Sequence, residues 1–314
     1  MFDAIESNVH KSWILLGFFI ILIVALGYVA GRLFSLGYLG VGFAVALALG
    51  SAWASYYYSD AVVLSISGAR EVSAEENAFL HNTVEGLAIA AQIPKPHIYI
   101  IDDPAPNAFA TGRDPAHAAI AVTQGLLDKM NRQEVEGVLA HEMSHIENFD
   151  IRFSTLVVVL VGTIALLSDF FWRDLRYGGR RERDTGSAIF MVVGLVLAIL
   201  APIIAQLIQL AVSRQREYLA DMNGARLTRN PEGLASALTK LEADDEALSA
   251  ANKATAHLYI VNPLHDLGGR MNSLFDTHPP IEDRIRRLRA LEGISSQSFS
   301  GPTVTPPTAP PSTS

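Results

Sequence analysis

The sequence predicts an α-helical membrane protein that carries a soluble α+β domain. Half of its 314 residues are apolar and 18% are charged, whereas a soluble domain has about 25% charged residues. Four long apolar stretches contain no Asp, Glu, Lys or Arg, and they are Ser12–Gly31, Leu33–Ser59, Phe153–Ser168 and Thr185–Ser213. The rest of the chain has about 25% charged residues, as a soluble protein does. The pattern therefore predicts four transmembrane helices in two hairpins, beside a water-exposed domain.

The composition also excludes several classes of site. The chain contains no cysteine, which excludes disulfide frameworks, iron–sulfur clusters, thiolate zinc sites and cysteine nucleophiles. Any metal site must therefore use His, Asp or Glu. The formal net charge of −8 offers no basic surface for nucleic acid, so we expect no nucleic-acid partner.

The first hairpin is expected within residues 1–59. Asp3 and Glu6 remove the positive charge that precedes a cleavable signal peptide, so the first apolar segment is expected to remain as an anchor. About 20 apolar residues are enough to cross a bilayer as a helix, and both apolar segments reach that length. The turn between them is expected near Arg32 and Gly37.

The next region, residues 60–152, has a soluble composition with β-rich sequence between two helical patterns. Ser73–Glu76 is a capping-box pattern that predicts a helix ending near Ala91. Asn131–Glu134 repeats this pattern, and the apolar spacing within Val135–Ile146 predicts a helix with one buried face. Three strands are predicted between the helices, at His97–Ile101, Asn107–Thr111 and Ala118–Thr123.

Residues 153–213 predict the second hairpin. Phe153–Ser168 is short for a membrane span unless the residues after it lie at the interface. Thr185–Ser213 is long enough even with Pro202 inside it. The soluble domain then resumes over residues 214–293.

The C-terminal part is predicted to be helical before it becomes disordered. The expected helices are Arg214–Thr228, Pro231–Asp244 and Glu282–Leu291. Prolines precede or begin the last two, as is common in a first helical turn. Residues 294–314 are rich in Ser, Thr and Pro and carry no charge, which predicts a disordered tail.

Residues 141–145 read His-Glu-Met-Ser-His, an H-E-x-x-H pattern on a predicted helix. Positions i and i+4 of a helix are neighbours, so the imidazoles of His141 and His145 can share one metal ion. Glu142 then projects beside the ion. There it can take a proton from a metal-bound water, whose pKa a zinc site lowers to about 7. The pattern predicts a metal site suited to hydrolysis.

A catalytic zinc ion takes three protein ligands and leaves a fourth position open to water. Glu217 and Asp221 lie at i and i+4 of a predicted helix, directly after the last apolar segment. Their spacing alone is compatible either with the third ligand or with a solvated acidic pair.

Four motifs occur in order along the chain: N-A-F-A-T-G at Asn107–Gly112, A-H-E-M-S-H at Ala140–His145, R-E-Y-L-A-D at Arg216–Asp221, and T-H-P-P-I-E-D-R-I at Thr277–Ile285. Together with the two apolar pairs, they make the chain resemble the HtpX family of membrane zinc metalloproteases, relatives of the CAAX prenyl proteases. The resemblance covers nearly the whole chain apart from the tail. It implies a zincin-type α+β domain interrupted by a membrane hairpin.

The resemblance also implies roles for the residues of the metal site. One Zn²⁺ per chain would be bound by His141, His145 and Glu217, with Glu142 as the general base. Asp221 would accept a hydrogen bond from the free N–H of a zinc-bound histidine and so fix its tautomer.

Substrate contacts are implied in the same way. His278, which two prolines hold rigidly, would stabilise the oxyanion of the tetrahedral intermediate. Asn107, Ala108, Phe109 and Ala110 would form an edge strand that pairs with an extended substrate backbone. The remaining histidines have no ligand-like spacing and are expected to be ordinary residues; they are His10, His81, His97, His117, His257 and His265.

The function implied is an endopeptidase that cleaves membrane or membrane-associated polypeptides in protein quality control and the stress response. A processing protease for prenylated or peptide substrates is a second possibility, although such enzymes enclose a chamber with more than four spans. A membrane scaffold or transport subunit with a structural zinc site is a third, but it would have no use for Glu142.

The side of the membrane that holds the domain does not follow from charge. Residues 60–152 and 214–293 must share one side because both supply ligands. Lys and Arg near the spans number seven on that side and six on the other, so the positive-inside rule does not decide. The resemblance implies a multi-pass protein of a bacterial inner membrane with a cytoplasmic catalytic domain. The expected partners are polypeptide substrates and the lipid bilayer, while the oligomeric state is left undefined.

Overall fold

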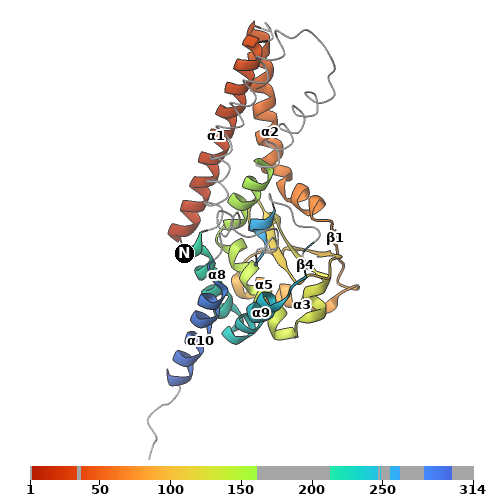
Figure 1. Cartoon of the computed structure of the whole chain (residues 1–314), viewed down its shortest axis with the longest axis vertical. Helices are drawn as coiled ribbons and strands as arrows, with labels where there is room; N and C mark the ends of the chain where they lie inside the picture. Colours follow the sequence, from red (N-terminus) through yellow and green to blue (C-terminus); the bar gives the residue numbers. More distant parts are fainter. Residues whose placement is uncertain are drawn as a thin grey trace, which may run out of the picture.

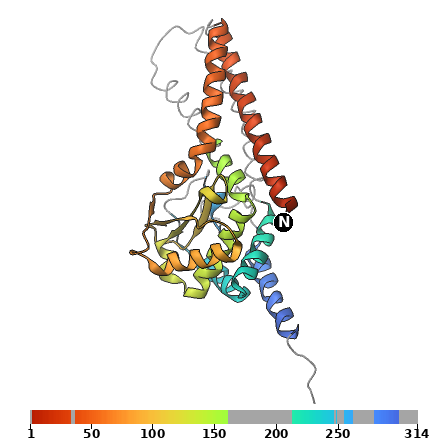
Figure 2. The ribbon, with the colours of Figure 1, turned by 180° about the vertical axis from the view of Figure 1, so that it is seen from behind.

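The computed structural model describes residues 2–33, 37–160, 213–246, 248, 255–261 and 279–298. Two long helices, α1 (Phe2–Leu33) and α2 (Gly37–Ile66), lie side by side and project from an α+β body (Figure 1). The start of α1 lies beside α8 (Arg214–Thr228), and the same arrangement is seen from behind in Figure 2. The N-terminal helix therefore begins next to the body and leads away from it.

The first predicted hairpin is present, and both of its helices are longer than the charge-free segments. Its buried face packs Phe19 and Ala48 against Phe153 and Leu156 of the helix that follows residue 149. Among the described residues, one helix segment, Ile5–Ala25, is long and apolar enough to cross a membrane. Most of the second predicted hairpin falls at residues 161–212, outside the described residues.

A four-stranded sheet forms the centre of the body, in the order β1-β2-β4-β3. Its strands are β1 (Ala69–Glu71), β2 (His97–Ile101), β3 (Ala108–Gly112) and β4 (Ala118–Thr123). β2 and β4 are parallel, and the other two pairs are antiparallel. β2 and β4 have the predicted bounds, and β3 is shifted by one residue. β3 is an edge strand, as the resemblance implied for this segment.

Alternation along the strands buries both faces of the sheet. Ile120 and Val122 face a core shared with Val138 and Leu139 of α5 (Arg132–Glu147). Ala119 and Ala121, which alternate with them along β4, face a second core that also contains Val158 and the end of α2. The sheet is therefore enclosed, and its β3 edge is presented toward α5.

Helix caps explain where the first helices of the body begin. α5 has the predicted capping box, in which Asn131 accepts from the Glu134 N–H and Glu134 accepts from the Asn131 N–H. The prediction for Ser73–Glu76 is wrong, because these residues form a turn. Instead Asn77 caps α3 (Ala78–Ala91), since its carboxamide accepts the N–H of Leu80. β4 is followed by the short α4 (Gln124–Lys129).

The helices after residue 213 pack closely on α5. α9 (Pro231–Ala243) meets α5 at Gly137, where an added Cβ would lie 2.6 Å from the Leu234 nitrogen. α8 meets it at Gly224, where a Cβ would lie 3.1 Å from the His141 nitrogen. Such close backbone contact leaves little freedom for α8 to shift relative to α5.

The last helix, α10 (Ile281–Ser298), packs on α9 and α8 and then leaves the body. It is longer than predicted, so residues 294–298 are helical rather than part of a disordered tail. A short segment, residues 255–261, contains the 3-10 helix η2 (Ala256–Leu258) and lies against β3. The rest of the predicted tail, residues 299–314, is outside the described residues.

Candidate active site

α5 places the two histidines of the H-E-x-x-H pattern on one face. The rings of His141 and His145 are T-shaped with centroids 4.8 Å apart, and their Nε2 atoms are 3.2 Å apart. Two nitrogens bound tetrahedrally to zinc at about 2.0–2.1 Å would be separated by about 3.3 Å. The two Nε2 atoms therefore have the separation that a shared zinc ion requires.

Glu217 of α8 completes a cluster of three residues, His141, His145 and Glu217, which we call the metal-type cluster. Its Oε2 lies 3.6 Å from His141 Nε2, and its Oε1 lies 3.7 Å from His145 Nε2. One donor atom from each of the three side chains lies within 4.8 Å of the other two. Two imidazoles and one carboxylate are a donor set used by catalytic zinc sites, so these residues fit the metal that the sequence implied.

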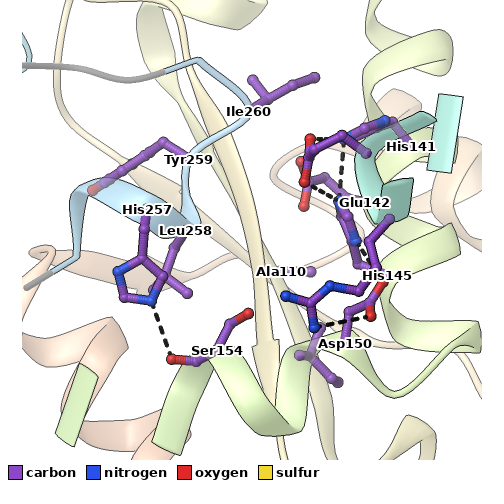
Figure 3. Close-up of a pocket in the computed structure, with 13 residues that line it drawn as sticks. Ala110, His141, Glu142, His145, Asp150, Ser154, His257, Leu258, Tyr259 and Ile260 are labelled. Carbon is purple, nitrogen blue, oxygen red and sulfur yellow. Dashed lines mark hydrogen bonds and ion pairs between the residues drawn. The ribbon is translucent and has the colours of Figure 1, made fainter. Parts of the chain in front are cut away.

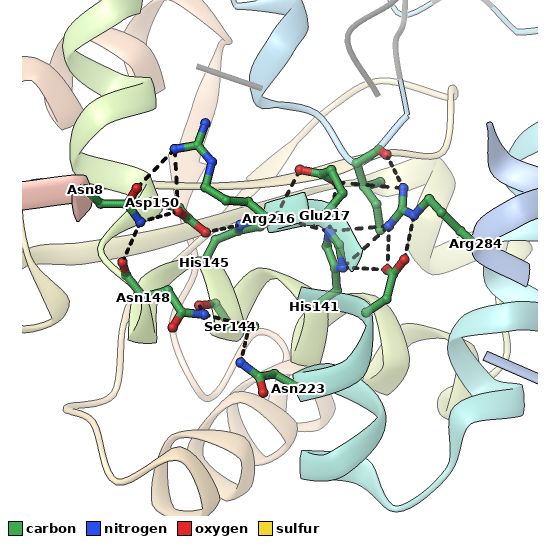
Figure 4. A network of polar contacts seen from close by, with 12 residues as sticks. Asn8, His141, Ser144, His145, Asn148, Asp150, Arg216, Glu217, Asn223 and Arg284 are labelled. Atoms are coloured by element: carbon green, nitrogen blue, oxygen red, sulfur yellow. Dashed lines mark hydrogen bonds and ion pairs between the residues drawn. The ribbon is translucent and has the colours of Figure 1, made fainter. Parts of the chain in front are cut away.

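Each histidine has a carboxylate at its other ring nitrogen. Asp221 Oδ1 lies 3.0 Å from His141 Nδ1. Asp150 Oδ2 lies 3.0 Å from His145 Nδ1 (Figure 4). Arginine partners accompany these carboxylates, since Arg284 donates to both oxygens of Asp221 at 2.7 and 2.9 Å. The acidic partners hold a proton on each Nδ1 and turn the Nε2 atoms toward Glu217.

The charged groups in and around this buried cluster strongly shift one another's pKa values. Burial alone would lower the pKa of His141, but its contacts with Asp221 and Glu217 raise that pKa to about 9. Burial alone would raise the pKa of Asp221, but Arg284 and His141 lower it to about 2. Positive charge is thus favoured between the histidines and the carboxylates, as a cation site requires.

Glu142 points into the pocket beside the cluster, which the segment 257–260 closes on the other side (Figure 3). It is 2% exposed, and burial raises the pKa of its carboxyl group. A hydrogen bond with the backbone of Ala110 opposes that rise. A buried carboxylate with a raised pKa, next to a metal-type cluster, is suited to accept and return protons.

The chain's own segment 255–261 lies along one end of the β3 edge. The Ile260 N–H donates to the Ala108 carbonyl at 3.1 Å, and the Asn107 side-chain amide donates to the Val261 carbonyl at 3.1 Å. The Phe109 side chain lies on the opposite face of β3 from Ala108 and Ala110, and it packs edge-on against Tyr259. Ala110 lines the pocket beside Glu142. Of the four edge residues expected to bind substrate, Ala110 therefore lies nearest the metal-type cluster.

Of the site residues that the sequence predicted, His278 lies outside the described residues.

The sequence analysis did not predict three other residues of the site, Asp150, Arg284 and His257. Asp150 and Arg284 received no role, although Arg284 belongs to the motif at 277–285. His257 was expected to be ordinary, but it lines the pocket and contacts the Ser154 carbonyl at 3.3 Å. Charged residues close to a metal motif were the available signal for Asp150, but sequence distance could not show which charges meet.

Comparisons with known proteins point to a family of peptidases. The model described as Peptidase family M48 matches residues 73–292. A protein named Protease HtpX homolog from Dictyoglomus thermophilum is 50% identical over 290 residues, covering 92% of this chain and 94% of that protein. Proteins of the same name from Tropheryma whipplei and Streptococcus pneumoniae are 47% identical over 291 residues and 46% identical over 301 residues. Both matches cover 93% of this chain, with 98% and 100% of the relatives.

Among solved structures, the chain is similar to one titled "Crystal Structure of S. mikatae Ste24p". The TM-score is 0.48 and the identity 19%, with 92% of this chain and 67% of that chain covered.

Proposed function

The chain belongs to peptidase family M48, a metalloprotease family, and we propose that it is an integral-membrane zinc endopeptidase. The proposed ligands are His141, His145 and Glu217. The observation that supports this most strongly is the convergence of these three donors next to a buried glutamate in one pocket. The proposed substrates are membrane or membrane-associated polypeptides, misfolded ones among them, as in protein quality control.

Each side chain would have a defined task in peptide hydrolysis. When bound, a zinc ion supplies Lewis acidity, which polarises a carbonyl and lowers the pKa of water to about 7. Glu142 accepts the proton of the attacking water and passes it to the departing amine, since its raised pKa brings it closer to neutral pH. Asp221 keeps the proton of His141 on Nδ1.

Substrate would be held from two sides in this proposal. The β3 edge, proposed from Asn107 to Ala110, would receive an extended peptide at its Ala110 end, because the segment 255–261 already pairs with the Ala108 end. His278 would donate to the developing oxyanion. The alternative of a membrane scaffold or transport subunit with a structural zinc site is not favoured, because a buried Glu142 that is not a ligand would then cost stability without a use.

Metal removal tests the proposed activity directly. The detergent-purified chain is expected to cleave casein, to lose this activity after treatment with a zinc chelator, and to regain it with about one equivalent of Zn²⁺. Glu217→Ala should lose both bound metal and cleavage, because it removes a ligand. Asp245→Ala, a change on the surface of the same body, serves as the control. Cleavage that persists in the metal-free protein would contradict the proposal.

Several side chains of the hairpin support its placement in a bilayer. Among the side chains that the structure describes, almost all the exposed large apolar ones lie on α1 and α2. Trp13 stacks on Tyr56, and Trp53 contacts Tyr57, at the end near the body. A further exposed tyrosine, Tyr38, lies about 15 residues from Trp53, which is roughly 22 Å along the helix. Aromatic residues at two such levels are typical of the two membrane interfaces.

The proposed arrangement is four spans in a bacterial inner membrane, with the catalytic domain in the cytoplasm. Because the chain has no cysteine, single cysteines can be labelled without background. In spheroplasts, Gly179→Cys is expected to react with a membrane-impermeant thiol reagent from outside. Ala74→Cys, an exposed position before α3, should react only after lysis. Reaction of Ala74→Cys from outside would show that the orientation is the opposite of the proposed one. Protection of both positions until lysis would mean that the second hairpin does not cross the membrane.

A further inference from the structure

Asn8 brings α1 into contact with Asp150 and Arg216, beside the metal-type cluster. It is 2% exposed, although it lies in the apolar segment Ile5–Ala25. Its amide nitrogen donates to Asp150 Oδ1 at 2.6 Å and to the Asn148 carbonyl at 3.0 Å. Its own oxygen accepts from Arg216 Nη1 at 3.4 Å. A buried carboxamide in an apolar helix is unfavourable unless it is hydrogen-bonded, so these contacts fix α1 at this position.

Asp150 stands between Asn8 and the proposed ligand His145. Its Oδ1 receives the Asn8 amide and lies 3.6 Å from Arg216 Nη1, while its Oδ2 lies 3.0 Å from His145 Nδ1. Because both neighbours of Oδ1 are donors, the carboxylate is held with Oδ2 facing the imidazole. His145 therefore carries its proton on Nδ1 and presents the Nε2 lone pair toward His141 (Figure 4).

The two halves of the cluster are built alike. His141 has Asp221 at Nδ1, and Arg284 holds that carboxylate. His145 has Asp150 at Nδ1, and that carboxylate is held by Arg216 together with Asn8. In the second arrangement Asn8 comes from α1, 142 residues from Asp150 in the sequence.

We propose that Asp150 and Asn8 are positioning residues for the metal ligand His145, so that the N-terminal helix is part of the metal centre as well as an anchor. Asp150 fixes the tautomer and the ring orientation, and Asn8 fixes Asp150. This inference rests on the proposed function, because it requires a metal ion at His141, His145 and Glu217.

Zinc affinity of the purified full-length protein, measured by chelator competition, tests the inference. Asp150→Asn should weaken zinc binding by roughly 10–100-fold. Its amide oxygen would stay toward the donors Asn8 and Arg216, so its NH₂ group would face His145 Nδ1 and the ring proton would move to Nε2. Asn8→Ala should weaken binding by about three- to tenfold, since it acts one step further from the metal.

Two controls separate positioning from a general loss of structure. Ser12→Ala is the matched control, because Ser12 is equally buried on α1 and donates to the Asn8 backbone carbonyl. It should leave zinc affinity unchanged. In an Asp150→Ala background, Asn8→Ala should have no further effect, because its path to His145 is gone. With saturating Co²⁺, the absorption bands of Asp150→Asn should shift while those of Ser12→Ala remain as in the wild type.

The outcomes distinguish the two proposals. A wild-type protein that binds no zinc would overturn the proposed function and this inference with it. A wild type that binds zinc, with Asn8→Ala binding it as tightly as Ser12→Ala does, would overturn the inference alone. An additive effect of Asn8→Ala in the Asp150→Ala background would also overturn it, because Asn8 would then act by another route.

Discussion

Glu142→Gln is expected to abolish peptide hydrolysis while leaving about one zinc ion per chain. The amide keeps the size of the side chain but cannot accept the proton of an attacking water, and general base catalysis contributes roughly 10²–10⁴-fold to rate. Because Glu142 is not among the three clustered donors, its replacement should leave the metal in place. Casein cleavage and metal content, measured on the same preparation, check both halves of this expectation.

Glu136→Gln is the matched control for that variant. Glu136 lies on the same helix, and its replacement makes the same chemical change away from the pocket. It should retain full activity. Near wild-type cleavage by Glu142→Gln would exclude Glu142 as the base, whereas loss of zinc from this variant would mean that Glu142 also holds the ion.

Arg284→Met is expected to cause the largest loss of stability. The guanidinium group is fully buried and donates to both carboxylate oxygens of Asp221, which is itself 3% exposed. Removing Arg284 leaves the buried Asp221 with His141 as its remaining charged partner, and removing one partner of a buried ion pair costs about 3–5 kcal/mol. For a body of this size that corresponds to a fall in melting temperature of roughly 10 °C, which thermal unfolding of the metal-free protein in detergent would measure.

A second substitution separates lost charge pairing from lost packing. In Arg284→Met/Asp221→Asn no buried charge is left alone, so part of the stability should return. Arg286→Met, on the exposed side of α10, should change the melting temperature little. An Arg284→Met protein as stable as the wild type would show that the pair with Asp221 is not needed to hold the site.

Local signals predicted the elements that carry the site. Asn131 and Glu134 mark the start of α5 because a capping box needs only neighbouring residues. β2 is rich in Ile and β4 in small and β-branched residues, and turn residues flank both, so their bounds follow from composition. The helix start predicted at Ser73 was wrong because Asn77, four residues later, caps α3. β1 was missed because its three residues have no strand pattern and depend on pairing with β2.

The partners of the histidines could not be predicted in the same way. The motif identified His141 and His145, but the contacts of Asp150, Arg284 and Asn8 depend on how α1, α5, α8 and α10 pack. Arg284 is 143 residues from His141, and Asn8 is 142 residues from Asp150. Over such separations many charged residues are equally plausible partners, and the tertiary structure selects among them.

The division of the metal-type cluster between α5 and α8 also sets an order of events during synthesis. His145 is synthesised about 70 residues before Glu217, a delay of roughly 4–14 s at about 5–20 residues per second. Throughout this interval the nascent chain has two of its three donor side chains and no Arg284. A chain assembled in this way has no complete ligand set until Glu217 of α8 has been made, and the arginine that holds Asp221 follows later still, with α10.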